Sequence, residues 1–285
     1  MSAPIQMSQL YSEHATLRFI LWGAYSKVFN RRLKVEHSLG DGTFCSDIEN
    51  QPITEEMTQK LTAEITALLD SDLQIELIEM TRDSLIDHFT QQNMPDKVGL
   101  LKTWQQEYIP CIRFGDFLDY TIFTMSTDKQ RLKIFEIRPY QRGLVIRYPD
   151  LADPNSITEY QDLPVLHKMF DEFSQWAKIW NVDYVAKLNH KIYKRKINDI
   201  KWIAEGLHSK KFSEMADKLT ENFSKKRIIT IAGPSSSNKT TFAKRLAISL
   251  SVNGYDSLVI GMDDFYKDRK DIPFGPDGEQ DFESI

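Results

Sequence analysis

Hydrophobic residues recur every three or four positions through residues 8–30, which predicts a long amphipathic helix. A second helical pattern follows Thr54, a residue type suited to a helix N-cap, and a third covers residues 81–92 after Thr81. Short apolar or alternating runs predict strands at residues 33–37, 43–48, 73–80, 109–114, 117–123, 132–137 and 143–148. The last four are expected to form an antiparallel meander. Residues 1–150 therefore predict an α+β domain, an antiparallel sheet with helices packed on it.

The pattern changes twice after this domain. Residues 151–224 begin with a linker and continue as a charge-rich helical pattern, which predicts a helical connector. Residues 225–285 begin with three basic residues, followed by an entirely apolar run at residues 228–232 that is typical of a buried parallel strand. A helix over residues 242–252 and a second strand at residues 257–262 complete one βαβ unit. This segment predicts the start of an α/β domain.

Composition excludes several classes of protein. Lysine and arginine number 36 and aspartate and glutamate 41, so the formal net charge is −5, which argues against a non-specific nucleic-acid coat protein. Hydrophobic residues make up 41% and charged residues 27%, values that exclude wholesale disorder. Two cysteines cannot build a disulfide framework. The apolar run at residues 19–22 is far too short to span a bilayer, so we expect a soluble, cytoplasmic protein without a membrane partner.

Residues 233–240 have the sequence Gly-Pro-Ser-Ser-Ser-Asn-Lys-Thr, which approximates the phosphate-binding loop pattern G-x-x-x-x-G-K-[S/T]. In such a loop, backbone N–H groups and the N-terminus of the next helix wrap a phosphate chain. Lys239 is expected to reach the β- and γ-phosphates, and the Thr240 hydroxyl to bind Mg²⁺. Asn238 replaces the second glycine and tolerates left-handed backbone better than other side chains. The predicted binding residues for ATP and Mg²⁺ are Gly233, Ser235, Ser236, Ser237, Asn238, Lys239, Thr240 and Thr241. The competing interpretation is a serine-rich turn with a chance lysine.

The loop and its following helix resemble the phosphoribulokinase/uridine kinase family, as do the segments Met262-Asp-Asp-Phe-Tyr-Lys-Asp268 and Asp277-Gly-Glu-Gln-Asp-Phe-Glu283. The resemblance implies an ATP-dependent kinase that phosphorylates the 5′-hydroxyl of a uridine- or cytidine-like nucleoside. It implies that Asp263 is the catalytic base, that Lys239 is catalytic, and that Tyr266 lines the nucleoside pocket. The competing interpretation of Asp263-Asp264 is a solvated turn.

A doubly wound nucleotide-binding sheet needs about five strands and about 150 residues, more than follow Gly233 in this sequence. We therefore expect an incomplete kinase domain that binds nucleotide weakly at best. A truncated chain and a naturally short protein both remain open. Two other functions also remain open: a non-catalytic nucleotide- or RNA-binding protein, and an aminoacyl-tRNA editing hydrolase.

The first 150 residues resemble the editing-type domain of threonyl-tRNA synthetase, in the hairpin at residues 35–42 and in residues 115–119. That family uses an H-x-x-x-H pair and a C-x-x-x-H pair, which in metal-binding relatives surround zinc. The equivalent residues here are His14, Arg18, Tyr120 and Thr124, so the ligand set is lost. We expect a retained scaffold that contacts a nucleoside, an RNA end or the kinase domain.

Isolated residues of this domain have simpler interpretations. Cys45 and Cys111 are expected to be buried small hydrophobes, and His37 a structural histidine with its hydrogen bonds satisfied. Arg138, Arg142 and Arg147 predict either a phosphate-contact patch or a solvated hairpin edge. The connector carries a short basic face, Lys191, Lys194, Arg195 and Lys196, which is expected to be solvated. Oligomerisation remains open.

Overall fold

The computed structural model of the chain describes residues 7–151, 153–221, 228–234, 236–265, 271–275 and 278. The chain divides into two compact units, Met1–Lys194 and Arg195–Ile285, called the first and second unit below. Of the connector expected at residues 151–224, residues 164–179, 185–193 and 197–220 are helical, and the segment is shared between the two units. No helix in these ranges is both long and apolar enough to cross a membrane.

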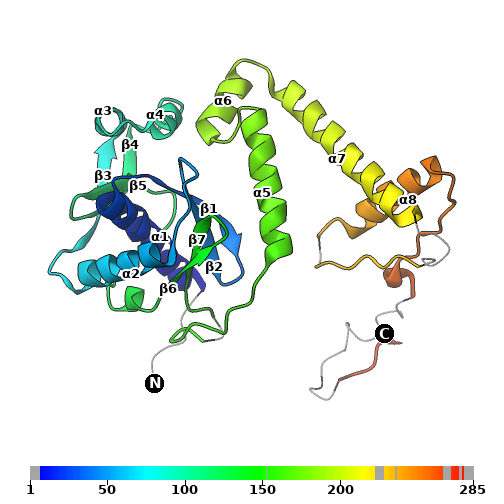
Figure 1. Cartoon of the computed structure of the whole chain (residues 1–285), viewed down its shortest axis with the longest axis horizontal. Coiled ribbons are helices and arrows are strands. Elements are labelled where there is room, and N and C mark those ends of the chain that lie inside the picture. The colour runs from blue at the N-terminus through cyan, green and yellow to red at the C-terminus, as the bar shows by residue number, and fades with distance from the viewer. Residues whose placement is uncertain are drawn as a thin grey trace. The chain divides into compact units, whose positions relative to one another are not determined.

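The first unit is an α+β structure in which helices and strands follow one another as Figure 1 shows. Its described elements are α1 (Met7–Phe29), β1 (Leu33–Leu39), β2 (Gly42–Asp47), α2 (Glu55–Asp70), β3 (Ile75–Thr81), α3 (Arg82–Gln91), α4 (Pro95–Leu101), β4 (Tyr108–Phe114), β5 (Phe117–Tyr120), the 3₁₀ turn η1 (Arg131–Lys133), β6 (Glu136–Tyr140), β7 (Gly143–Arg147), α5 (Pro164–Ile179) and α6 (Val185–Tyr193).

Two antiparallel sheets replace the single meander expected for the last four strands. β4 and β5 extend β3 in the order β3-β4-β5, whereas β6 and β7 join the first hairpin in the order β1-β2-β7-β6. Phe44 of β2 lies opposite Val145 of β7, a pairing between segments about 100 residues apart. The strand predicted at residues 132–137 is also wrong at its start, because Leu132 reaches the core from η1 rather than from a strand. Apolar alternation marks half-buried positions but does not determine which strands pair.

The main core of the first unit surrounds α1. Leu17, Ile20, Leu21 and Tyr25 are essentially unexposed, at the three- and four-residue spacing visible in the sequence. A Cβ atom at Gly23 would lie 2.4 Å from the ring of Phe117, so glycine lets α1 approach β5 closely. A second cluster packs α3 and α4 against β4, with Leu85, Phe89, Leu101, Ile109 and Cys111 at its centre.

Local caps define two of these helices as the sequence predicts. The Thr54 hydroxyl accepts a hydrogen bond from the Met57 N–H (3.3 Å) at the start of α2. The Thr81 hydroxyl accepts one from the Ser84 N–H (3.3 Å) at the start of α3. Each cap satisfies an N–H group that has no partner within its own helix.

The described part of the second unit is built on a helix pair, α7 (Ile197–Thr220) and α8 (Lys239–Val252), followed by the 3₁₀ turn η3 (Met262–Phe265). Phe212 and Ala216 of α7 pack against Leu246 and Leu250 of α8. The guanidinium carbon of Arg245 lies 5.2 Å from the centre of the Phe212 ring, and the group also bonds His208 (2.9 Å).

The two strands expected in the second unit are not formed in the part of the chain that the structure describes. Residues 228–232 and 257–261 have no strand pairing, and Ile228 and Leu258 are both 85% exposed. Ile231 alone of the first run packs at the edge of the α7–α8 cluster. Strands buried on both faces need neighbouring strands and covering helices, and the described residues of this unit do not supply them.

Candidate phosphate-binding site

Two described residues of the loop before α8 have left-handed backbone. Asn238 is in the left-handed conformation (φ 65°, ψ 24°), and Ser236 also has a positive φ of 61°. The helix begins at Lys239, three residues before its predicted start, and its first backbone bond runs from the Phe242 N–H to the Asn238 carbonyl (2.9 Å). The prediction that asparagine can replace glycine in this conformation is confirmed.

Lys239 closes the loop on itself. Its amino group donates to the carbonyl oxygens of Gly233 and Pro234, both at 2.8 Å. The Ser237 N–H donates to the same Pro234 carbonyl (3.2 Å). A Cβ atom at residue 233 would lie 2.6 Å from the Ser237 hydroxyl oxygen, so only glycine fits there without movement. The structure thus brings Gly233, Ser237, Asn238 and Lys239 into one compact turn.

This turn presents positive charge and free donors at a helix N-terminus. The first N–H groups of a helix have no partner in their own helix, and the helix dipole adds partial positive charge there. The N-cap Asn238 makes no side-chain cap bond, and the first turn of α8 contains no acidic residue. Thr240 and Thr241 lie in this first turn and are exposed. These features suit an anion such as a phosphate group.

Other predicted site residues are placed only in part. Ser235 and Tyr266 lie outside the described residues, and for Asp263 only the backbone is described, within η3. The next carboxylate, Asp264, folds back toward its own turn: its N–H donates to the Gly261 carbonyl (3.2 Å), and an oxygen of its carboxylate lies 3.1 Å from where a Gly261 Cβ would stand. Within the described ranges, no hydrogen bond or ion pair joins Asp264 to Lys239.

The residues of the first unit that correspond to an editing site are engaged in structural contacts. His14 stacks on Tyr148 (4.2 Å between ring centres) and its Nε2 lies 3.0 Å from the Pro149 carbonyl oxygen. Burial lowers the pKa of His14. Tyr120 instead packs near Phe89 and Trp104. Among residues that the structure describes, no three His, Cys, Asp or Glu side chains are grouped to hold a metal ion.

The structure confirms the expectation for the two cysteines and differs from the expectation for His37. Cys45 and Cys111 are buried and unpaired, as expected, and burial raises the pKa of the Cys111 thiol to about 11. His37 differs from expectation, because its Nε2 atom is buried without a hydrogen-bond partner in the described structure. Its ring stacks instead on Phe170 of α5 (4.1 Å).

The three arginines near the β6–β7 hairpin do not form a free phosphate patch. Arg147 is 2% exposed and binds the carboxylates of Asp41 (2.7 Å) and Glu136 (2.5 Å). Those hydrogen bonds, with the one to Asp41 foremost, raise the pKa of Arg147 further. Arg138 lies 4.0 Å from the ring centre of Tyr160, and Arg142 donates to the Asn50 carbonyl (2.6 Å). The alternative interpretation, a solvated hairpin edge, is also wrong for Arg147, because this side chain is buried where three segments of the chain meet.

A buried ion pair in the first unit was not foreseen from the sequence. Lys97 of α4 lies 2.5 Å from Asp119 of β5, and its amino group faces the rings of Trp22 (4.0 Å), Phe89 (4.8 Å) and Tyr120 (5.7 Å). The only available signal was the presence of Lys97 and Asp119 in two partly apolar segments, which does not reveal that the two meet.

No family model matches this chain, and none of the curated proteins compared with it is significantly similar.

Proposed function

We propose that this chain is a nucleotide-binding phosphotransferase of uridine kinase type, which holds Mg·ATP on residues 233–241. The observation that carries the proposal is the turn at the start of α8. In this turn Asn238, with left-handed backbone, precedes Lys239, and the Lys239 amino group donates hydrogen bonds to two carbonyl oxygens of the loop. A phosphate group placed at the helix N-terminus would offer that amino group stronger, charge-assisted bonds than the two carbonyls do.

The roles of the chain's residues follow from their chemistry. Backbone N–H groups of residues 236–241 would orient the phosphates, and Lys239 would stabilise charge on the β- and γ-phosphates. The Thr240 hydroxyl would contribute one ligand to Mg²⁺. Asp263 would accept the proton of a nucleoside 5′-hydroxyl, and Tyr266 would line the pocket of a uridine- or cytidine-like nucleoside.

A second function, nucleotide binding without phosphoryl transfer, is favoured by one observation. The apolar runs at residues 228–232 and 257–261 are unpaired and mostly exposed. The segment leading to Asp263 is therefore not held by a sheet within the described residues, and phosphoryl transfer requires its groups within a few tenths of an ångström of the reactive geometry.

Calorimetry with Mg·ATP on the full chain tests the binding step. Lys239→Ala should remove binding, whereas Lys244→Ala, a matched change at an exposed lysine of the same helix, should leave it unchanged. Thr240→Val should weaken binding only when Mg²⁺ is present. Equal affinity of the Lys239→Ala variant and the unchanged protein would refute the site.

A phosphorylation assay with uridine and cytidine separates the two functions. Transfer that Asp263→Asn lowers, with ATP affinity retained, supports the kinase. Binding that depends on Lys239 but gives no transfer to either nucleoside supports the non-catalytic alternative.

A further inference from the structure

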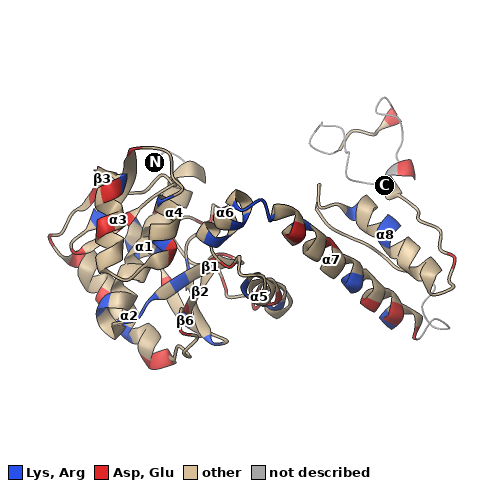
Figure 2. Cartoon of the chain, turned by 90° about the horizontal axis from the view of Figure 1, so that it is seen from above, with Lys and Arg blue, Asp and Glu red and all other residues tan. Residues whose placement is uncertain are grey.

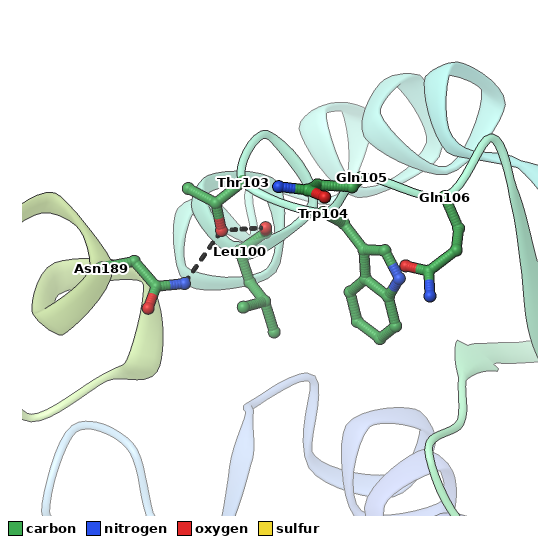
Figure 3. A pocket seen from close by; sticks show the side chains of 6 residues that line it. All are labelled: Leu100, Thr103, Trp104, Gln105, Gln106 and Asn189. Atoms are coloured by element: carbon green, nitrogen blue, oxygen red, sulfur yellow. Dashed lines mark hydrogen bonds between the residues drawn. The ribbon is translucent and has the colours of Figure 1, made fainter. Parts of the chain in front are cut away.

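A hollow of about 560 Å³ opens on the first unit where α4, the loop after it and α6 meet. Its lining consists of Leu100, Thr103, Trp104, Gln105, Gln106 and Asn189. Figure 3 shows the side chains of Leu100 and Trp104 pointing to the same side of the loop, with Asn189 reaching from α6 toward Thr103. The hollow belongs to one unit and is unrelated to the loop at residues 233–241.

The frame of this hollow is built from several fixed contacts. Gly99 of α4 lies so close to α6 that a Cβ atom there would be 3.0 Å from the Cβ of Ala186. The Asn189 amide donates to the Thr103 hydroxyl (2.9 Å), which in turn donates to the Leu100 carbonyl (2.8 Å). These contacts join α4 to α6.

The loop that forms the other wall is also held from both ends. Arg82, the first residue of α3, donates its side chain to the Trp104 carbonyl (3.1 Å) and its N–H to the Glu107 carbonyl (2.8 Å). The Trp104 ring packs edge-on against Tyr120 (5.6 Å), at the margin of the second core cluster. The indole is therefore positioned before any ligand arrives, which lowers the entropic cost of binding.

The lining combines an aromatic and an aliphatic surface with three amides and contains no charged side chain. Each amide offers donors and an acceptor. Gln105 and Gln106 use theirs in no hydrogen bond within the described structure, and Asn189 uses only its nitrogen. A purely apolar ligand would strip water from these groups without replacing its hydrogen bonds. The lining instead suits a flat, uncharged ring that has both donors and acceptors on its edge.

Lysines occur in the two segments that form this neutral lining. Lys102 adjoins Thr103 and is exposed, and α6 contains Lys187, His190 and Lys191 but no acidic residue. Figure 2 shows the lysines of α6 in blue. Lys187 is paired with Asp183, so the available cations are Lys102 and Lys191, with Glu107 the nearest carboxylate along the loop. A neutral ring that carries a phosphate matches this arrangement better than a neutral sugar does.

We propose that this hollow binds a nucleobase, stacked on Trp104 and hydrogen-bonded along its edge by Gln106 and Asn189, with its phosphate near Lys102. Stacking on an aromatic ring accepts any base, whereas amides select among bases by their donors and acceptors. The base could belong to a free nucleotide or to single-stranded RNA, since both present the same ring and phosphate.

The test uses the full chain carrying Lys239→Ala, so that the proposed ATP site does not contribute. Uridine monophosphate, adenosine monophosphate and labelled ten-nucleotide uridine and adenosine RNAs are titrated by calorimetry and fluorescence anisotropy. Trp104→Ala should weaken binding by at least about fivefold, the lower end of what one stacked base contributes. Trp104→Phe, which retains a ring, should keep most of the affinity, and Trp202→Ala, at an exposed tryptophan of α7, should have no effect.

The outcomes distinguish a free nucleotide from single-stranded RNA and can overturn the inference. Binding of the mononucleotides indicates a free nucleotide, and binding of RNA alone indicates a single strand; both support the site if Trp104→Ala weakens them. Binding unaffected by Trp104→Ala in a variant with unchanged circular dichroism overturns it. Absence of binding at millimolar ligand, or equal binding of a neutral monosaccharide, overturns it as well. None of these results depends on whether residues 233–241 bind ATP.

Discussion

The ion pair between Lys97 and Asp119 is the most sharply testable feature of the first unit, and Asp119→Asn is the perturbation that isolates its charge. The Lys97 side chain is 11% exposed and the Asp119 side chain 22% exposed. Burial lowers the pKa of Lys97 and raises the pKa of Asp119, so desolvation outweighs their mutual attraction. Removing the carboxylate charge leaves the ammonium group buried without a counter-charge.

The cost can be bounded by the alternative open to Lys97, which is to lose its proton. Neutralising a lysine of ordinary pKa at pH 7 costs about 4.6 kcal/mol, at 1.36 kcal/mol per pKa unit. If Lys97 instead stays charged, its attraction to the three aromatic rings, about 1 kcal/mol, remains in the variant and reduces the cost of leaving it without a counter-charge. We therefore expect Asp119→Asn to lower the free energy of unfolding by about 3–4 kcal/mol, within the range for breaking a buried pair.

Urea unfolding measured by hydrogen exchange of the β4 amides reports on the first unit alone. The matched control is Asp70→Asn, which removes the partner of Lys133 from an exposed pair at 2.6 Å (38% and 56% exposed) and should cost less than about 0.5 kcal/mol. The double change Lys97→Met with Asp119→Leu should restore most of the stability, since no charge is then buried.

The change in stability of Asp119→Asn with pH provides an independent test. In Asp119→Asn, the folded-state pKa of Lys97 lies below its unfolded value, so the unfolded chain binds more protons between the two. Stability of the variant should therefore rise as the pH increases from 7 to 9. A loss below about 1 kcal/mol at pH 7 would mean that water reaches Lys97, and a double variant as unstable as Asp119→Asn would mean that shape, not charge, determines the cost.

Three further outcomes are expected. Burial lowers the pKa of His37, so the contact between β1 and α5 should be fully stable above pH 6.5 and weaken as the pH falls through the folded-state pKa. The fluorescence of Trp176 and Trp180 measures the loss of this contact as a function of pH. The variant His37→Phe should make that fluorescence less dependent on pH. Gly233→Ala should weaken Mg·ATP binding in calorimetry, because its Cβ would stand 2.6 Å from the Ser237 hydroxyl, which would have to turn away; unchanged affinity would contradict a role for this close contact. Thr54→Ala should lower the free energy of unfolding of the first unit by about 1 kcal/mol through loss of its cap, and no change in urea unfolding would contradict that role.

Features that depend on neighbours within a few residues were predictable from the sequence. The helix caps at Thr54 and Thr81 formed where the sequence predicts them. Asn238 adopts the left-handed conformation that the loop pattern demands, because that preference is a property of its own backbone and side chain. The helix α1 also forms where the spacing of its apolar residues predicts one, although its burial extends beyond that face to Glu13 and Thr16.

Features that depend on which distant segments meet were decided by the tertiary structure. The pairing of β2 with β7, the burial of Arg147 between Asp41 and Glu136, and the contact of Lys97 with Asp119 each join parts of the chain that local patterns treat as independent. The apolar run at residues 228–232 is a case in which a local pattern predicts burial that the described structure does not show. Its composition predicts burial, but burial requires partners on both faces, and a strand's own residues do not specify whether those partners are present.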